Sequence, residues 1–333
     1  MHEASLIATW SFALTPVRDA WPALASGGRP MDAVVEISRA IEEDPSVDSV
    51  GRGALPDADG NLTLDAMVMS GPEAIGAVAG VQGRMPVIDA AVRVMERTPH
   101  ILVVGAGADR QADLAAAESG DGRVDARRGD LVTDAARQRW EAWRAAGARD
   151  VEDQSRDGGL APPRPIDRGT GTLFHDGPGG HDTVCVLARG AGADGTLAGG
   201  ATTSGTPWKV PGRVGDAPIV GHGLYVHPRW GAATVTGSGE LAMASCTAFL
   251  AVERLRAGDG PVEAAAAALA RVLEDHELEA HHQLAVAIMT PDGFSASAAI
   301  RPGYRSVRVR GGPDATVEVV APDVELLGPP VGE

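Results

Sequence analysis

A segment rich in glycine, proline and charged residues divides this chain into two parts. It runs from about Arg149 to Gly180 and shows little apolar periodicity, which predicts a linker or an exposed loop. Patterns typical of strands and helices lie on both sides of it. The fold must therefore be assembled from two halves that each mix α and β elements.

Apolar spacing predicts the elements of each half. Ahead of the linker we expect strands at 5–10, 61–69 and 74–81, the last two as a hairpin, helices at 30–43 and 86–97, and a short strand with a glycine turn at 101–108. After it we expect strands at 183–190, 195–205, 231–239, 282–290 and 294–300, a long helix at 241–256 and an alanine-rich helix at 261–274.

The composition is that of a globular protein, since 44% of the 333 residues are apolar and 22% are charged. Aromatic residues make up only 4% and there are 43 glycines, so small and aliphatic side chains must fill the core. The formal charge of −16, with Lys209 as the single lysine, disfavours binding to nucleic acid.

The two cysteines, Cys185 and Cys246, are too few for a disulfide framework or a four-cysteine zinc site. The N-terminus lacks the basic region of a signal peptide, and no apolar run approaches the length of a membrane span. We therefore expect a cytoplasmic protein that binds no membrane.

The junction at the end of the linker carries the first chemical signal. The linker ends in Gly-Gly-His181-Asp182-Thr183 and passes directly into a strand pattern. If the bond between Asp182 and Thr183 is cut, Thr183 gains an α-amine beside its hydroxyl. An α-amine titrates at roughly 7.7–8.0, so it can act as general base for that hydroxyl. Taken alone, the triplet is more often simply the start of a strand.

Further motifs change that interpretation. After the junction they are TTSG at 202–205, GRVGDAPIVG at 212–221 and TVTGSGE at 234–240. Before it they are Thr9-Trp10, SGGRPMDAV at 26–34, Asp44-Pro45, Ser49-Val50-Gly51 and Thr63-Leu64-Asp65-Ala66. In this order and spacing they resemble the glycosylasparaginases, the aspartylglucosaminidase branch of the N-terminal-nucleophile (Ntn) hydrolases. The resemblance covers nearly the whole chain.

The resemblance implies the roles of the catalytic residues. Thr183 is expected to be the nucleophile, and Asp182–Thr183 the bond broken by autoproteolysis. Thr203 would hydrogen-bond near the nucleophile and orient it. Thr236 and Gly237 would form the oxyanion hole through a hydroxyl and a backbone N–H.

The resemblance also implies how a substrate is held. Arg213 would bind the substrate α-carboxylate as a bidentate fork, and Asp216 its α-ammonium. Trp10 and Ser49 match positions that line the pocket in the family. Residue types alone favour a surface ion pair of small energetic value for Arg213 and Asp216, whereas for Trp10 they fit a core aromatic residue and a pocket residue equally well.

Three departures from the family pattern bear on substrate preference. Cys185 stands where the family commonly has glycine, and Gly221-His222-Gly223 stands where it has Gly-Ala-Gly. The stretch from Ser49 to Ala54 replaces SVG-aromatic-GG. None of these changes removes a catalytic group.

The fold implied is a four-layer αββα sandwich, an α+β fold of the Ntn-hydrolase type. It forms one domain from residues 1–182, ending in the linker, and residues 183–333, beginning with the nucleophile. The function implied is hydrolysis of the side-chain amide of an N4-substituted asparagine, such as GlcNAc-Asn, without a cofactor. The family also leads us to expect a processed αβ heterodimer that pairs further, with a small asparagine-linked substrate as its partner.

Several alternatives stay open. The same site suits a plant-type L-asparaginase or isoaspartyl dipeptidase, or the chain is an unprocessed, non-catalytic homologue. ILVVGAGADR suggests dinucleotide binding after Gly105-Ala106-Gly107, but Arg110 occupies the third glycine position. The pairs His222/His227 and His281/His282 lack the third ligand and the spacing of a metal site, so we expect no metal.

Overall fold

A computed structural model describes residues 3–119, 131–145, 183–192, 195–278 and 282–328. The predicted linker at 149–180, His181 and Asp182 lie outside the described residues. Among the described residues no helix has both the length and the apolar character needed to cross a membrane.

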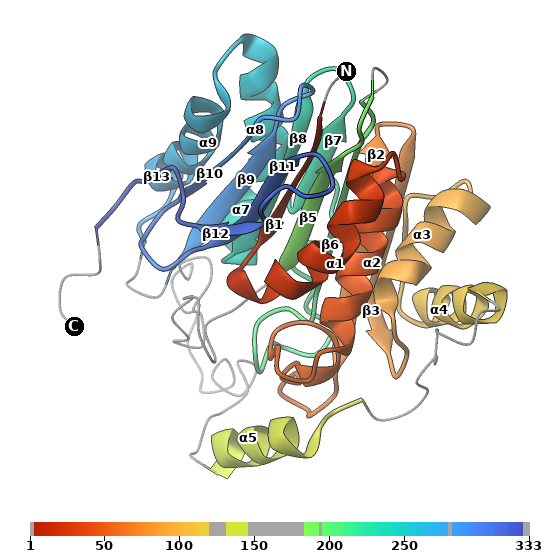
Figure 1. Ribbon diagram of the computed structural model, residues 1–333. Helices are drawn as coiled ribbons and strands as arrows, with labels where there is room; N and C mark the ends of the chain where they lie inside the picture. The colour runs from red at the N-terminus through yellow and green to blue at the C-terminus, as the bar shows by residue number, and fades with distance from the viewer. Residues whose placement is uncertain (1–2, 120–130, 146–182, 193–194, 279–281, 329–333) are drawn as a thin grey trace.

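Two β-sheets form the centre of the molecule (Figure 1). The larger, sheet A, has the order β12-β11-β1-β5-β6-β2-β3-β4, and the smaller, sheet B, has the order β13-β10-β9-β8-β7. The strands of sheet A are β1 (Ala4–Thr9), β2 (Thr63–Gly71), β3 (Ala74–Gln82), β4 (Leu102–Val104), β5 (Val184–Arg189), β6 (Leu197–Thr203), β11 (Ser306–Gly311) and β12 (Glu318–Val320). Those of sheet B are β7 (Leu224–His227), β8 (Gly231–Gly237), β9 (Leu284–Met289), β10 (Ser295–Ala299) and β13 (Val324–Glu325).

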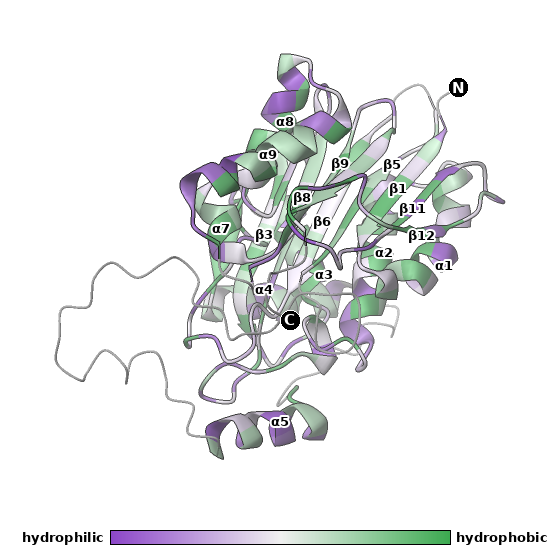
Figure 2. Cartoon of the chain, turned by 90° about the vertical axis from the view of Figure 1, so that its left-hand side faces the viewer, coloured by the Kyte–Doolittle hydropathy of each residue, from purple (hydrophilic) through white to green (hydrophobic). Residues whose placement is uncertain are grey.

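Helices cover the outer face of each sheet, which gives four layers (Figure 1). The helices on sheet A are α1 (Leu14–Ala25), α2 (Pro30–Glu43), α3 (Val87–Arg97) and α4 (Ala106–Ser119). Sheet B is covered by α8 (Thr247–Ala257) and α9 (Pro261–Asp275), with the short α7 (Gly239–Ala244) before them, and α5 (Asp134–Ala145) lies to one side. Figure 2 shows apolar strands in the middle and polar outer faces on the helices. The predicted αββα sandwich is confirmed.

Small side chains let the two sheets approach closely. Apolar residues on the facing sides, among them Met67, Leu187 and Leu224, form one buried cluster between the sheets. Gly199 on β6 lies under this cluster, and a Cβ there would come within 2.7 Å of Leu224 Cδ1 and 2.9 Å of Leu187 Cδ2. The glycine-rich, aromatic-poor composition is therefore a requirement of the contact between the sheets.

The strand order of sheet A interleaves the two halves of the chain. β1 lies between β11 and β5, and β2 pairs with β6. Strands from before the linker therefore alternate in blocks with strands from after it. The two halves therefore share sheet A, and the division of one domain at residue 183 stays a prediction.

One predicted helix is wrong in its extent. The helix expected at 241–256 is two helices, α7 and α8, because Cys246 adopts a left-handed backbone (φ 47°) that ends one helix and begins the next. The short strand and glycine turn predicted at 101–108 are present as β4 and Gly105, and α4, which was not predicted, follows them. However, β4 is a three-residue edge strand and its sheet pairs mainly antiparallel strands, unlike a dinucleotide-binding fold.

A buried carboxylate joins α2, α3 and β6. Glu42 accepts hydrogen bonds from the backbone N–H of Val87 (2.7 Å) and Ile88 (3.1 Å) at the start of α3, and from Thr202 Oγ1 (2.7 Å). Burial raises the pKa of Glu42 to about 8, although these three donors oppose the rise.

This carboxyl makes the stability of the fold depend on pH. Because the pKa of Glu42 is higher in the folded chain than the ordinary 4.5, its contribution is complete below pH 4.5 and is lost as the pH rises through 8. The loss is about 5 kcal/mol at most, from about 1.4 kcal/mol for each pKa unit. Chemical unfolding between pH 5 and 8 should show the free energy of unfolding falling. The Glu42→Gln variant should lack most of that fall, and an equal slope in both proteins would contradict the assignment.

Candidate active site

Thr183 lies buried at the start of β5, in a row of polar side chains. Val184 pairs with Thr202, so the same register extended by one residue sets Thr183 opposite Thr203. Thr203 pairs in turn with Asp65 on β2. Residues opposite each other on antiparallel strands share a face of the sheet. Thr183, Thr203 and Asp65 therefore line one row on the face that looks toward sheet B.

Two hydroxyl groups hold the backbone carbonyl of Thr183. Thr9 Oγ1 donates to it at 3.1 Å and Thr236 Oγ1 at 2.9 Å. Thr9 Oγ1 also accepts the backbone N–H of Cys185 at 2.9 Å. The start of β5 is thus fixed by a strand of sheet A and a strand of sheet B.

Trp10 belongs to the site and to the core at once. Its ring is fully buried and meets Tyr304 edge-on at 5.3 Å, and its backbone is left-handed (φ 67°), which is rare for a bulky residue. Its Nε1–H donates to Thr236 Oγ1 at 3.1 Å. Trp10 therefore orients the Thr236 oxygen, whose single hydrogen points at the Thr183 carbonyl in the uncut chain.

Gly237 follows Thr236 at the end of β8. Its backbone has φ 119°, and a Cβ there would lie 2.3 Å from the carbonyl oxygen of Gln283. Only glycine fits this position. The backbone of Gly237 is held in place beside the Thr236 hydroxyl.

Arg213 forms an ion pair, but not the one expected from sequence. Its Nε and Nη2 donate to the Glu240 carboxylate, both at 2.7 Å. Nη1 is directed toward Gly205 and Gly215, where added Cβ atoms would lie 2.9 and 2.8 Å from it. Burial raises the pKa of Glu240, but the Arg213 guanidinium outweighs that effect and holds it below the usual value.

Asp216 lies beside this guanidinium and is 4% exposed. A Cβ on Gly239 would be 2.7 Å from Asp216 Oδ1 and 3.0 Å from Arg213 Nη2. A buried anion and a largely buried cation therefore converge on the start of α7. Neither side chain is exposed as a surface ion pair would be, since Asp216 is 4% exposed and the Arg213 side chain 16%.

Ser49 links the first-half loop to the TTSG segment. Its carbonyl accepts the backbone N–H of Ser204 at 3.0 Å and Ser204 Oγ at 2.9 Å. Thr203 Oγ1 accepts the backbone N–H of Gly205 at 2.9 Å. These bonds fix the loop that turns from the threonine row toward Arg213.

The departures from the family pattern lie at different depths. Cys185 is buried between the sheets, where its thiol donates to the Val235 carbonyl at 3.3 Å. His222 lies farther out, with Nδ1 3.0 Å from the Val220 carbonyl and Nε2 3.6 Å from Cys246 Sγ. Cys185 therefore joins the two sheets beneath the site, whereas His222 lies near its rim, on the loop that hydrogen-bonds to the Asp216 carbonyl through Gly223.

The sequence analysis assigned no role to several residues that the structure brings to the site. They are Thr9, Asp65, Lys209 and Glu240. Glu240 and Thr9 lie in the motifs TVTGSGE and Thr9-Trp10. The sequence therefore marks these two residues but does not show which residues they contact. A single lysine in 333 residues was the only hint for Lys209.

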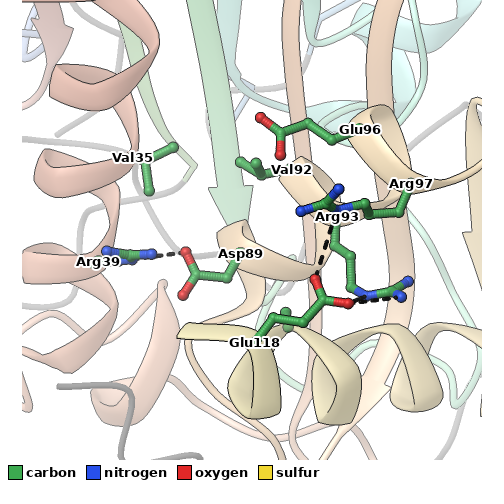
Figure 3. Close-up of a pocket in the computed structure, with 9 residues that line it drawn as sticks. Val35, Arg39, Asp89, Val92, Arg93, Glu96, Arg97 and Glu118 are labelled. Carbon is green, nitrogen blue, oxygen red and sulfur yellow. Dashed lines mark hydrogen bonds and ion pairs between the residues drawn. The ribbon is translucent and has the colours of Figure 1, made fainter. Parts of the chain in front are cut away.

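Other hollows and clusters do not compete with this site. The groove between α2, α3 and α4 in Figure 3 has a volume of about 220 Å³, and its charges pair with one another. In it Arg39 contacts Asp89 at 2.7 Å, and Arg93 contacts Glu118 at 3.1 Å. It lies in the helix layer, on the opposite side of sheet A from Thr183. Within the described ranges no three His, Cys, Asp or Glu side chains gather as metal ligands would.

The arrangement combines three chemical capacities. A buried threonine at a strand start can attack a carbonyl once an α-amine is present to take its proton. Thr236 and Gly237 lie next to it with a hydroxyl and a backbone N–H. Arg213 and Asp216 lie on the side of the TTSG loop and can hold a carboxylate and an ammonium. Together they suit an acyl transfer from a small zwitterionic amide.

Comparison with known proteins gives a consistent result. A family model described as asparaginase (Asparaginase_2) matches residues 8–298. The chain is 34% identical over 269 residues to the N(4)-(beta-N-acetylglucosaminyl)-L-asparaginase of Elizabethkingia miricola, covering 81% of this chain and 69% of that protein. It is 32% identical over 275 residues to the protein of the same name from Rattus norvegicus, covering 80% and 76%. It is also 32% identical over 310 residues to an L-asparaginase-like protein of Drosophila erecta, covering 88% and 72%.

Proposed function

The chain belongs to the asparaginase family, and we propose that it hydrolyses the side-chain amide of N4-substituted asparagine, of the GlcNAc-Asn type, to release aspartate. The observation that carries this proposal is the row of Thr183 and Thr203 on the face toward sheet B, with Arg213 and Asp216 beside the TTSG loop. Two similar proteins carry the name N(4)-(beta-N-acetylglucosaminyl)-L-asparaginase.

Maturation in this proposal is an autoproteolysis. The Thr183 hydroxyl oxygen attacks the carbonyl carbon of Asp182, the peptide C–N bond breaks, and the hydroxyl proton passes to the Thr183 nitrogen, which becomes the new α-amine. Water then hydrolyses the ester and leaves the Asp182 carboxylate. The hydrogen bonds from Thr9 and Thr236 to the Thr183 carbonyl hold Thr183, the residue that follows the bond to be cut, in place.

Turnover repeats the chemistry on a substrate. The α-amine takes the Thr183 proton, the hydroxyl oxygen attacks the side-chain amide carbon, and the oxyanion is held by Thr236 and Gly237. The glycosylamine leaves with a proton, and water hydrolyses the aspartyl ester. Thr236 must turn its hydrogen from the Thr183 carbonyl to the oxyanion, while Trp10 continues to hold its oxygen.

Recognition rests on both ends of the free amino acid. Arg213 takes the α-carboxylate and Asp216 the α-ammonium, so asparagine residues inside a protein should be poor substrates. Because these groups contact only the aspartyl part, asparagine and β-aspartyl peptides are the second candidate substrates. A cytoplasmic, processed αβ heterodimer that pairs further is part of the same proposal, supported by the two cysteines and the interleaved sheet.

The test compares three substrates on the purified protein. We expect mass spectrometry to show a fragment beginning at Thr183, and kcat/KM to be higher for GlcNAc-Asn than for asparagine or a β-aspartyl dipeptide. A higher value for either of the latter would assign the chain to the asparaginase or isoaspartyl dipeptidase alternative. Uncut protein without activity after prolonged incubation would support the non-catalytic alternative.

A further inference from the structure

Lys209, the single lysine of the chain, is buried next to the proposed substrate site. The residue is only 6% exposed and lies in the loop that follows β6. Within the described part of the chain its ammonium makes one hydrogen bond, a long one of 3.5 Å to the Thr63 carbonyl. An ammonium carries three N–H donors, so the described residues accept a hydrogen bond from only one of them.

Asp65 is the anion that compensates this buried charge. Its Oδ1 accepts the backbone N–H of Gly80 at 2.8 Å, and its Oδ2 is buried with no hydrogen-bond partner among the described residues. Burial lowers the pKa of Lys209 and the Arg213 charge lowers it further, whereas Asp65 raises it. Burial in turn raises the pKa of Asp65, which the Lys209 charge opposes. Both partners of this pair are thus poorly solvated, and an anion bound beside the lysine would stabilise its charged form.

Lys209 and Arg213 flank the same glycine. A Cβ on Gly205 would lie 2.9 Å from Arg213 Nη1 and 3.3 Å from Lys209 Nζ. Gly205 has φ 75°, so it keeps its turn without a side chain and leaves this space to the two cations. Glu240 contacts the other edge of the guanidinium, through Nε and Nη2. Two cations thus lie side by side on the edge that Glu240 does not occupy.

The strand register connects this pair of cations to Thr183 through Thr203 and Gly205. Gly205 bonds to Thr203 Oγ1, and Thr203 lies opposite Thr183 on the next strand. Neighbouring antiparallel strands have Cα atoms about 4.5–5.5 Å apart. In asparagine only one CH₂ group separates the amide carbon from Cα, so an amide at Thr183 places the α-carboxylate about one strand away.

We propose that Lys209, neutralised by Asp65, is a second cation of the α-carboxylate subsite and acts with Arg213 to select substrates that carry this group. The proposal rests on the proposed function for the identity of the substrate, but the subsite itself is a property of Lys209, Arg213 and Gly205. One carboxylate oxygen would accept from Arg213 Nη1 and the other from Lys209 Nζ.

The experiment measures selectivity rather than activity alone. The two substrates are GlcNAc-Asn and its analogue without the α-carboxylate, the GlcNAc amide of β-alanine. Losing one hydrogen bond to a charged group should lower the kcat/KM ratio of the two substrates about 10-fold or more in Lys209→Met. The change should come from KM for GlcNAc-Asn, with kcat nearly unchanged and the analogue unaffected. Lys209→Arg, which keeps a long cation, should recover most of the ratio.

Arg189→Met is the matched control. Arg189 is a cation 2% exposed that donates to the backbone carbonyls of Glu3, Gly190 and Pro291, all outside the site. This variant should lower stability without changing the ratio. If Lys209→Met lowers kcat/KM equally for both substrates, or for neither, the lysine is only structural and the proposal is overturned.

A binding measurement separates this inference from the proposed function. Calorimetry with L-aspartate and β-alanine on the same proteins reads the subsite without turnover. If the wild type binds L-aspartate in a manner that depends on Lys209 but hydrolyses no GlcNAc-Asn, the proposed function fails and the subsite stands. If the wild type hydrolyses GlcNAc-Asn and Lys209→Met retains the full ratio and affinity, the subsite fails and the function stands.

Discussion

Replacing Thr183 by alanine should leave one uncut chain of 34.1 kDa without measurable amidase activity. The variant lacks the only group in the proposal that forms a bond with carbon, both in autoproteolysis and in turnover. The carbonyl of residue 183 and its bonds from Thr9 and Thr236 belong to the backbone, so the site should otherwise keep its shape. A denaturing gel after long incubation and an assay with GlcNAc-Asn measure the two effects.

Two further variants test this explanation. Thr183→Ser keeps a hydroxyl and gains an α-amine after cleavage, so it should be cut, more slowly, and retain some activity. Thr183→Val keeps the shape of threonine without the hydroxyl and should behave as Thr183→Ala. Two bands on the gel of Thr183→Ala or Thr183→Val would refute the assignment of the nucleophile.

Replacing Arg213 by alanine should raise KM for GlcNAc-Asn about 10- to 100-fold, because the hydrogen bond from Nη1 to the carboxylate, which contributes about 1.5–3 kcal/mol, is lost while Nε and Nη2 already bind Glu240. The chain should still be cut between Asp182 and Thr183, because this bond has no free α-carboxylate for Arg213 to bind. Steady-state kinetics and a gel of the same preparation check both statements. An unchanged KM would remove Arg213 from the carboxylate subsite.

The partner of Arg213 requires its own control, because Arg213→Ala also leaves the Glu240 carboxylate without its cation. Glu240→Gln keeps a hydrogen-bond acceptor and removes that charge, so it shows how much of the effect is positioning of the guanidinium. Arg213→Lys keeps the charge without the planar fork. If both charge and geometry matter, Arg213→Lys should fall between wild type and Arg213→Ala in KM.

The sequence predicts the layers of this fold well because alternation in strands and spacing in helices follow burial directly. It fails where one residue sets the backbone. Cys246 looks like an ordinary helical residue, yet its left-handed conformation splits the helix expected at 241–256. The helices α1, α4 and α5 and the strands β7, β11, β12 and β13 were not predicted.

The candidate site is predictable to the level of motifs. Thr183, Thr203, Arg213, Asp216, Thr236 and Gly237 all lie in segments that the resemblance marked. Which of them touch could not be read from sequence, because those contacts join residues 27 to 226 positions apart, as between Arg213 and Glu240 or Trp10 and Thr236. The ion pair between Arg213 and Glu240 is the clearest example.

The interleaved order of sheet A favours folding before the proposed cleavage. β1 is hydrogen-bonded on both edges to strands from after the linker, and β2 is hydrogen-bonded on one edge to β6, which also comes after it. A chain that assembles this sheet before it is cut brings its strands together within one molecule, at the high effective concentration of a tether. After the cut, the same pairing would become an encounter between two molecules. In this proposal the mature protein keeps the fold that formed in the intact chain. Its two separate chains would reach that fold only at a rate set by their concentration, so the peptide bond that is later cut assists assembly.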